Sequence, residues 1–372
     1  MKSLFEKTAI GSMSLKNRFF RGALWEELAD EKGHLTPELI DIYLELAKGG
    51  VGTIITGYSF VWEDEQPNPR MMGIYDDSFI EEYKRLTDQV HQYDANIIMQ
   101  IVYGGSMTTF NVGDRKIWGP SSHINDRTGT KAEEISVDEI KHLVDAYAKA
   151  AKRVEQAGFD GVELHAGHGY LLSQFLSPFY NKRTDQYGGV IHNRARIIYE
   201  IVEAIRKEVR ADFPVLIKMN SQDFRDENGF KEEEAIEVAK HLQEIGISAI
   251  EVTGGDESAL EVFNGNLGPA RKGIARSIDR ESYFSAFAAR LASEVQMPII
   301  LIGGNRHFSK MEGILRTTNI NYFSLSRPLT AEPDLINQWH VDPSKKPKCV
   351  SCNKCYFTEG KRCILNQKKI QK

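Results

Sequence analysis

The sequence lacks any long apolar run. Its strongest apolar stretch, residues 297–302, falls far short of the roughly 20 residues that cross a bilayer. Residues 1–20 lack the apolar region of a secretory signal. A basic excess is missing too, since the formal net charge is -5 and the pI is about 6.1. We therefore expect a cytoplasmic protein with no membrane partner and no nucleic-acid partner.

Cysteine is absent from the first 348 residues. The four cysteines are Cys349, Cys352, Cys355 and Cys363. A secreted disulfide fold would spread its cysteines along the chain. Grouping them in one short segment instead predicts a metal site or a local redox device.

Short β-branched runs alternate with amphipathic segments, a pattern that predicts βα units around a parallel sheet. The expected strands are residues 18–24, 52–56, 96–102, 161–165, 215–219, 249–253, 299–302 and 322–325. Residues 138–156 and 232–245 have helical periodicity and end at Gly158 and Gly246. Eight such units predict an α/β fold, a (β/α)₈ TIM barrel. The alternative, a doubly wound sheet, usually has a glycine-rich turn after its first strand, and "FRGALWEELAD" is not one.

No linker interrupts the chain before Pro343, which lies in the linker-like segment "DPSKKPK". The sequence therefore predicts a barrel domain over residues 1–342 and a short cysteine-containing extension over residues 343–372.

The fourth expected strand runs into "GVELHAGHGYLLSQFLSPFYNKRTDQYGG". His165 ends the strand, and His168 and Tyr170 follow in a glycine-broken turn. Active residues of barrels lie at the carboxyl ends of strands. Two imidazoles and a phenol there would supply two hydrogen-bond donors and one acid. A plain polar role and a His-x-x-His metal pair are the alternatives.

The segments "HAGHGYLLSQFLSP", "NKRTDQYGG" and "NRARII" closely resemble the signature of the old yellow enzyme family. The similarity runs in order from "LKNRF" to "SRPLTAEPDL", about nine-tenths of the chain. The resemblance implies an FMN-containing barrel that takes hydride from NAD(P)H and passes it from flavin N5 to an activated alkene. His165 and His168 would then hold the acceptor oxygen, and Tyr170 would protonate the carbon.

The resemblance also implies cofactor contacts. Gln100 matches the glutamine that binds the flavin pyrimidine, and Lys218 falls where a cation lies near flavin N1. Glycines after the seventh strand and an arginine after the eighth suit a phosphate. The full expected set is Ala23, Leu24, Trp25, Gly57, Gln100, His165, Lys218, Gly303, Gly304, Ser326 and Arg327. Trp25 and Ser326 depart from the usual family residues.

The cysteine segment resembles the branch of the family that includes dienoyl-CoA reductase, which has an iron–sulfur site after the barrel. An iron–sulfur cluster, zinc and free thiols are the alternatives for these cysteines. We expect the segment to lie beyond all flavin contacts.

The sequence thus predicts an ene-reductase-like NAD(P)H oxidoreductase with a small-molecule electron acceptor. The alternatives are a flavin enzyme for quinones, nitro compounds or other acceptors, an FMN-free metal-dependent barrel enzyme, and a non-catalytic flavin-binding protein. Self-association as a homo-oligomer is left open.

Overall fold

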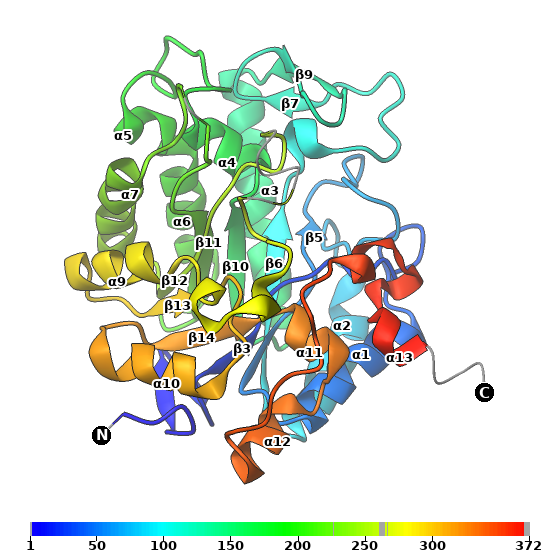
Figure 1. Cartoon of the computed structure of the whole chain (residues 1–372). Helices are drawn as coiled ribbons and strands as arrows, with labels where there is room; N and C mark the ends of the chain where they lie inside the picture. Colours follow the sequence, from blue (N-terminus) through cyan, green and yellow to red (C-terminus); the bar gives the residue numbers. More distant parts are fainter. Residues whose placement is uncertain (1, 226, 260–264, 266, 368–372) are drawn as a thin grey trace.

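The computed structural model describes residues 2–225, 227–259, 265 and 267–367. Eight parallel strands form a closed barrel, because β6 pairs with β4 on one side and with β10 on the other (Figure 1). The barrel strands are β3 (Phe19–Arg21), β4 (Thr53–Ile55), β6 (Asn96–Val102), β10 (Gly161–Ala166), β11 (Val215–Asn220), β12 (Ala249–Thr253), β13 (Ile299–Leu301) and β14 (Tyr322–Leu325). The predicted (β/α)₈ barrel is confirmed.

Helices cover the outside of the barrel (Figure 1). They are α1 (Pro37–Lys48), α2 (Phe79–His91), α3 (Val137–Gln156), α4 (Leu171–Leu176), α5 (Ile191–Arg194), α6 (Arg196–Glu208), α7 (Glu232–Glu244), α9 (Ser285–Glu294) and α10 (Phe308–Thr317), with α11 (Arg327–Ala331) and α12 (Leu335–Val341) after the last strand. The start of α3 is fixed by a capping box, in which Ser136 and Glu139 each accept the other's backbone N–H. Within the described ranges no helix is both long and apolar enough to span a membrane.

The barrel interior is apolar at its amino-terminal end. The hairpin of β1 (Thr8–Ile10) and β2 (Met13–Leu15) packs Ile10 and Met13 against inward residues such as Leu216 and Ile300. Two residues further along the strands, the inward positions become polar, with Lys218 after Leu216 on β11. Successive inward side chains on a strand lie two residues apart. The barrel interior is therefore apolar at the amino-terminal ends of the strands and polar at their carboxyl ends.

Short elements gather at that carboxyl end. They are β5 (Ser59–Phe60), β7 (Trp118–Gly119), β8 (His123–Ile124) and β9 (Lys131–Glu134). The C-terminal segment, residues 343–367, contains α13 (Ile364–Gln367) and folds back against the loop after β3 (Figure 1). There Lys361 Nζ lies 2.5 Å from Glu27 Oε2.

Candidate active site

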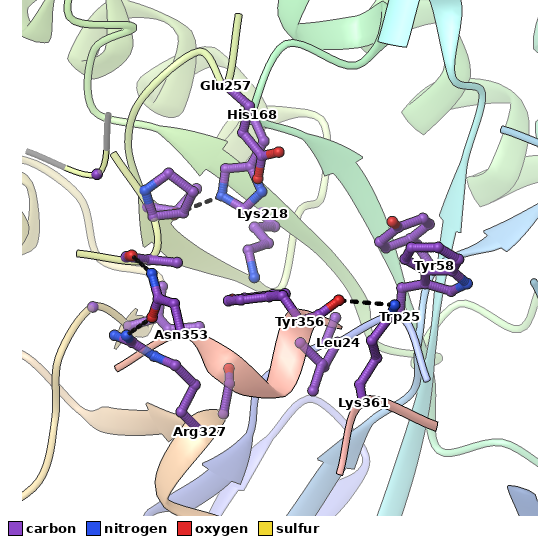
Figure 2. Close-up of a pocket in the computed structure, with 18 of the residues that line it drawn as sticks. Leu24, Trp25, Tyr58, His168, Lys218, Glu257, Arg327, Asn353, Tyr356 and Lys361 are labelled. Carbon is purple, nitrogen blue, oxygen red and sulfur yellow. Dashed lines mark hydrogen bonds between the residues drawn. The ribbon is translucent and has the colours of Figure 1, made fainter. Parts of the chain in front are cut away.

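A cavity of about 780 Å³ opens at the carboxyl ends of the barrel strands. Its walls come from the ends of β3 and β14, from the loops after β4, β10 and β13, and from the C-terminal segment (Figure 2). Ten expected site residues line it: Ala23, Leu24, Trp25, His168, Tyr170, Lys218, Gly303, Gly304, Ser326 and Arg327. Gln100, His165 and Gly57 are not among the lining residues.

His165 and His168 form a perpendicular ring pair. Their ring centroids are 5.0 Å apart at an interplanar angle of 89°. Burial, with a further contribution from the Lys218 charge, holds the pKa of both imidazoles well below the usual range. Both rings are therefore neutral at neutral pH, and each keeps one N–H to donate.

The backbone around His168 is held in an uncommon conformation. His168 has φ 61° and Gly169 has φ 87°, both in the left-handed region. The Asn220 side-chain oxygen accepts the His168 N–H at 3.2 Å, and the Thr253 hydroxyl lies 2.9 Å from His168 Nε2. Strands β11 and β12 therefore fix both the main chain and the ring of a residue carried by the loop after β10.

Tyr170 begins the short helix α4 and turns its ring toward His165, with centroids 4.7 Å apart. Burial raises the pKa of Tyr170 above its ordinary value, so the phenol is protonated at neutral pH. Its hydroxyl lies 3.1 Å from the hydroxyl of Tyr58. The site thus holds two neutral imidazoles and a protonated phenol around one end of a cavity.

Beneath this group lies a buried polar layer that the sequence analysis only partly anticipated. Gln100 Nε2 donates to Glu163 Oε1 at 2.6 Å, and Lys218 Nζ lies 2.8 Å from Glu251 Oε2. Burial, followed by the neighbouring Glu251 carboxylate, raises the pKa of Glu163 well above its ordinary value. The buried layer thus pairs Gln100 with Glu163 and Lys218 with Glu251.

The two glutamates were missed, although the sequence carried a signal for them. "GVEL" and "AIEV" each place one glutamate inside an otherwise apolar strand, where a charge is costly unless it is paired. Lys218 interrupts the apolar strand "VLIKMN" in the same way, so this reasoning extends to it. Applied to all three strands, it would have predicted the layer.

The opposite end of the cavity has features that suit a phosphate. Gly303 and Gly304 follow β13 with φ 108° and 77°, a conformation that other residues rarely adopt. Arg327 is 8% exposed at the start of α11. Its Nη1 donates to the Arg271 carbonyl at 2.9 Å and also to the Asn353 side-chain oxygen.

The C-terminal segment forms a wall of the cavity, contrary to the expectation that it lies beyond the site. Ser351, Asn353, Tyr356, Phe357 and Lys361 all line the cavity, and Figure 2 shows Tyr356 and Asn353 extending into it. Lys361 is 7% exposed, and its ammonium lies 4.3 Å from the ring centroid of Trp25. The segment is held by its own ion pair and packing, which composition alone could not indicate.

The predicted four-cysteine metal site is not supported. Cys349 and Cys355 are buried, Cys363 is half-buried and Cys352 is exposed. In the described parts of the chain, which include all four cysteines, no three His, Cys, Asp or Glu side chains are grouped as metal ligands. The same finding covers His165 and His168. Two perpendicular rings on a left-handed turn do not by themselves form a metal pair.

Unpaired buried atoms test whether the site fits a flavin. His165 Nδ1 and Gln100 Oε1 are buried without a hydrogen-bond partner in the protein. Such atoms are costly unless a bound group or water pairs with them. Both belong to inward side chains at the carboxyl end of the barrel. A planar ring with donors and acceptors on its edge, such as FMN, would pair with them if it reached past the lining residues, among which Lys218 is the charged group at this end. Gly57 offers less, because its N–H already donates to the Tyr43 hydroxyl at 3.1 Å.

Comparison with known proteins gives one consistent family. Residues 3–342 match the NADH:flavin oxidoreductase / NADH oxidase family. An NADH oxidase of Thermoanaerobacter brockii is 30% identical over 354 residues, covering 94% of this chain and 53% of its own. An NADPH dehydrogenase of Bacillus subtilis is 31% identical over 333 residues, covering 89% and 92%. The structure of a 2-naphthoyl-CoA reductase is similar, with a TM-score of 0.84 and 27% identity over 95% of this chain and 54% of the other.

The chain therefore spans about half the length of the T. brockii enzyme and nearly all of the B. subtilis enzyme. The family match ends at residue 342, so the expected likeness of the cysteine segment to the dienoyl-CoA reductase branch is not supported by it. The barrel, its cavity and the matched residues together show that this chain belongs to the NADH:flavin oxidoreductase / NADH oxidase family, the family of the old yellow enzymes.

Proposed function

We propose that the chain is an FMN-dependent NAD(P)H oxidoreductase that reduces alkenes activated by a conjugated carbonyl group. The observation that carries this proposal is the grouping of His165, His168 and Tyr170 at one end of the cavity. Two neutral N–H donors beside one protonated phenol suit an acceptor that gains charge on oxygen and a proton on carbon.

The cofactor contacts follow from the site. FMN, when bound, would supply hydride-transfer chemistry between the nicotinamide and the acceptor. Gln100, His165 and Lys218 are the residues that would meet the edge of its ring. The phosphate would lie against Gly303, Gly304, Ser326 and Arg327, and the main chain of residues 23–25 would form one face of the cavity.

We assign His165 and His168 as the hydrogen-bond donors to the acceptor oxygen. Both imidazoles are neutral, so neither loses a proton when negative charge develops on the acceptor oxygen. Preorganised donors in a water-poor site stabilise developing charge more than the same donors do in water. The hydrogen bond between His168 Nε2 and the Thr253 hydroxyl, together with the left-handed turn, fixes His168 before any ligand arrives.

Tyr170 is assigned as the proton donor to the acceptor carbon. Burial keeps its phenol protonated, and its position next to His165 places the acid beside the oxygen site. The names of the relatives support only the class of reaction, since two are nicotinamide-dependent and one is a reductase of an aromatic acyl-CoA. The chain's own donor and acceptor belong to the proposal.

A phenol titration tests the histidine assignment. The wild-type holoprotein should develop long-wavelength absorbance when p-hydroxybenzaldehyde stacks over the flavin. A His165→Ala, His168→Ala double variant should keep its FMN and lose this absorbance. His192→Ala, on the exposed face of α5, is the matched control and should behave like wild type. An unchanged absorbance in the double variant, or purified protein that cannot be loaded with FMN, would overturn the proposal.

A further inference from the structure

The loop after β4 places a second tyrosine against the proposed acid. Tyr58 Oη lies 3.1 Å from Tyr170 Oη, and the two rings are tilted with centroids 5.3 Å apart. Both tyrosines line the cavity. Tyr170 belongs to a small buried cluster with Phe60, Met71, Val102 and Met107, and the half-buried Tyr58 packs against this cluster. The family resemblance assigned nothing to Tyr58. Polar groups that hydrogen-bond each other in apolar surroundings interact strongly, which indicates that this hydroxyl pair has a function.

Asn68 donates a hydrogen bond to one member of this pair. Its side-chain Nδ2 donates to Tyr58 Oη at 3.2 Å, and its backbone N–H donates to Met71 Sδ at 3.2 Å, which holds the residue in place. An amide nitrogen can only donate. Tyr58 Oη accepts from Asn68, so the Tyr58 hydrogen is available to point at Tyr170 Oη. While Tyr170 is protonated its hydroxyl donates to Tyr58 Oη; once it has given up its proton it can only accept, and the Tyr58 hydrogen can then turn to it.

We propose that Tyr58, oriented by Asn68, is a positioning residue that prepares Tyr170 to act as the proton donor. This inference rests on the proposed function of Tyr170. When the Tyr170 O–H bond breaks and its proton forms the new C–H bond of the acceptor, the negative charge remains on Tyr170 Oη. The Tyr58 O–H donates to that oxygen and stabilises the charge until a proton from water restores the phenol.

The surroundings of the pair make such a donor necessary. Glu257 also lines the cavity, and its charge opposes a phenolate on either tyrosine; the buried Glu26 acts in the same sense on Tyr58. Arg127 offsets this only in part, because its Nη1 is paired with Glu257 Oε2 at 2.8 Å. A hydrogen bond to a charged oxygen is stronger than one between neutral groups. Tyr58 therefore contributes most after the proton has left.

The test compares Tyr58→Phe with Asn68→Asp in the FMN-loaded protein. In Tyr58→Phe, the rate constant for reoxidation by saturating 2-cyclohexenone should fall about 10- to 100-fold, the worth of one hydrogen bond to a charged group. The apparent Kd for the enone should stay within about 3-fold, since less than 0.7 kcal/mol of binding is involved. In Asn68→Asp, a carboxylate accepts the Tyr58 hydrogen and reverses the chain of hydrogen bonds, so the rate should fall in a similar way.

Three internal controls distinguish a positioning role of Tyr58 from general damage to the site in these variants. Flavin reduction by NAD(P)H and reoxidation by a nitro compound, which needs no carbon protonation, should stay within about 3-fold of wild type in both variants. The absorbance change with p-hydroxybenzaldehyde should persist, because the histidines are untouched. In a Tyr170→Phe background, Tyr58→Phe should cause no further loss of enone reoxidation, because residues that act as a unit are not additive.

The outcomes distinguish the two proposals. Slow enone reoxidation in Tyr170→Phe with normal reoxidation in Tyr58→Phe overturns the Tyr58 inference and leaves the proposed function intact. Normal reoxidation in Tyr170→Phe overturns the proton-donor role itself. An equal loss with the enone and the nitro compound in Tyr58→Phe identifies Tyr58 as a structural residue and overturns the inference as well.

Discussion

Two regions meet at the cavity, and they differ in what holds them in place. The end of β10 and the turn after it carry His165, His168 and Tyr170 within six residues, and the turn is fixed by the neighbouring strands through Asn220 and Thr253. The C-terminal segment reaches the same cavity from beyond α12 and is fixed by contacts with residues more than 300 positions earlier, such as Lys361 with Glu27. The first arrangement depends on strand register, and the second depends on tertiary packing alone.

The two regions also differ in what they contribute. The turn supplies the reactive side chains, and the C-terminal segment supplies part of the cavity wall. Strand register places a side chain with the precision of a hydrogen-bonded sheet, which an acid or an oxyanion donor needs. A wall residue such as Phe357, which is 87% exposed, only needs to occupy space. We therefore expect substitutions in the turn to change rates, and substitutions in the C-terminal segment to change stability or cofactor retention.

The largest effect should come from Tyr170→Phe. Loss of a general acid typically costs about 10²–10⁴-fold, so reoxidation of the FMN-loaded protein by an enone should slow by that factor. Reduction by NAD(P)H should be nearly unchanged, because it requires no proton from Tyr170. Stopped-flow absorbance separates the two half-reactions. Tyr93→Phe, on the surface, is the control, and equal losses in both half-reactions would indicate a structural role for Tyr170.

Arg327→Ala should have the next largest effect, on FMN retention. Removing one charge-assisted phosphate contact costs roughly 1.5–3 kcal/mol, which corresponds to about a 10- to 100-fold weaker Kd for FMN. Asn353→Ala removes the partner of Arg327 in the C-terminal segment but keeps the guanidinium, so its effect should be smaller. Fluorescence titration of the apoprotein with FMN measures both. Equal losses in the two variants would show that the segment, and not the strand end, secures the phosphate.

Particular residues show how far the sequence could reach. The bounds of β6, β12 and β14 were predicted exactly as the structure has them, because buried parallel strands are short, continuous apolar runs. Strand β3 is shorter than predicted, since only Phe19–Arg21 pairs with its neighbours before the chain turns toward the cavity. The positions of His165, His168, Tyr170 and Lys218 followed from strand ends and from the family resemblance.

The rest of the site could not be predicted from local sequence patterns. No periodicity links Lys361 to Trp25, or Tyr58 to Tyr170, because each pair is joined only by the closed barrel and its loops. The metal site suggested by the cysteine spacing is not supported by the structure. Thiols that are close in sequence still need convergent side chains, and in the described chain these do not converge as ligands.

Lys361→Ala should have a moderate effect on stability. The side chains of Lys361 and Glu27 are 8% and 28% exposed, and the ammonium also lies over the ring of Trp25. Losing a largely buried ion pair together with a cation–π contact should lower the free energy of unfolding by roughly 1–3 kcal/mol. Thermal or urea unfolding measures this. Lys346→Ala, an exposed lysine of the same segment, should unfold like wild type, and equal behaviour of the two variants would mean that the segment is not held at Lys361.

The smallest effect should come from Cys352, and its contrast with Cys355 decides what the cysteines do. If the thiols only pack against their neighbours, the loss of stability in each Cys→Ser variant should be larger where the replaced cysteine is more buried. Cys355→Ser buries a hydroxyl in place of a thiol and should cost about 1–3 kcal/mol, whereas Cys352→Ser, at an exposed position, should change the free energy of unfolding by less than about 0.5 kcal/mol. If the thiols were ligands of one metal, both substitutions would remove a ligand and destabilise the segment alike. Thermal unfolding of the two variants, with metal analysis of anaerobically purified protein, distinguishes these cases. Equal, large losses accompanied by loss of bound metal would contradict the packing interpretation that the structure supports.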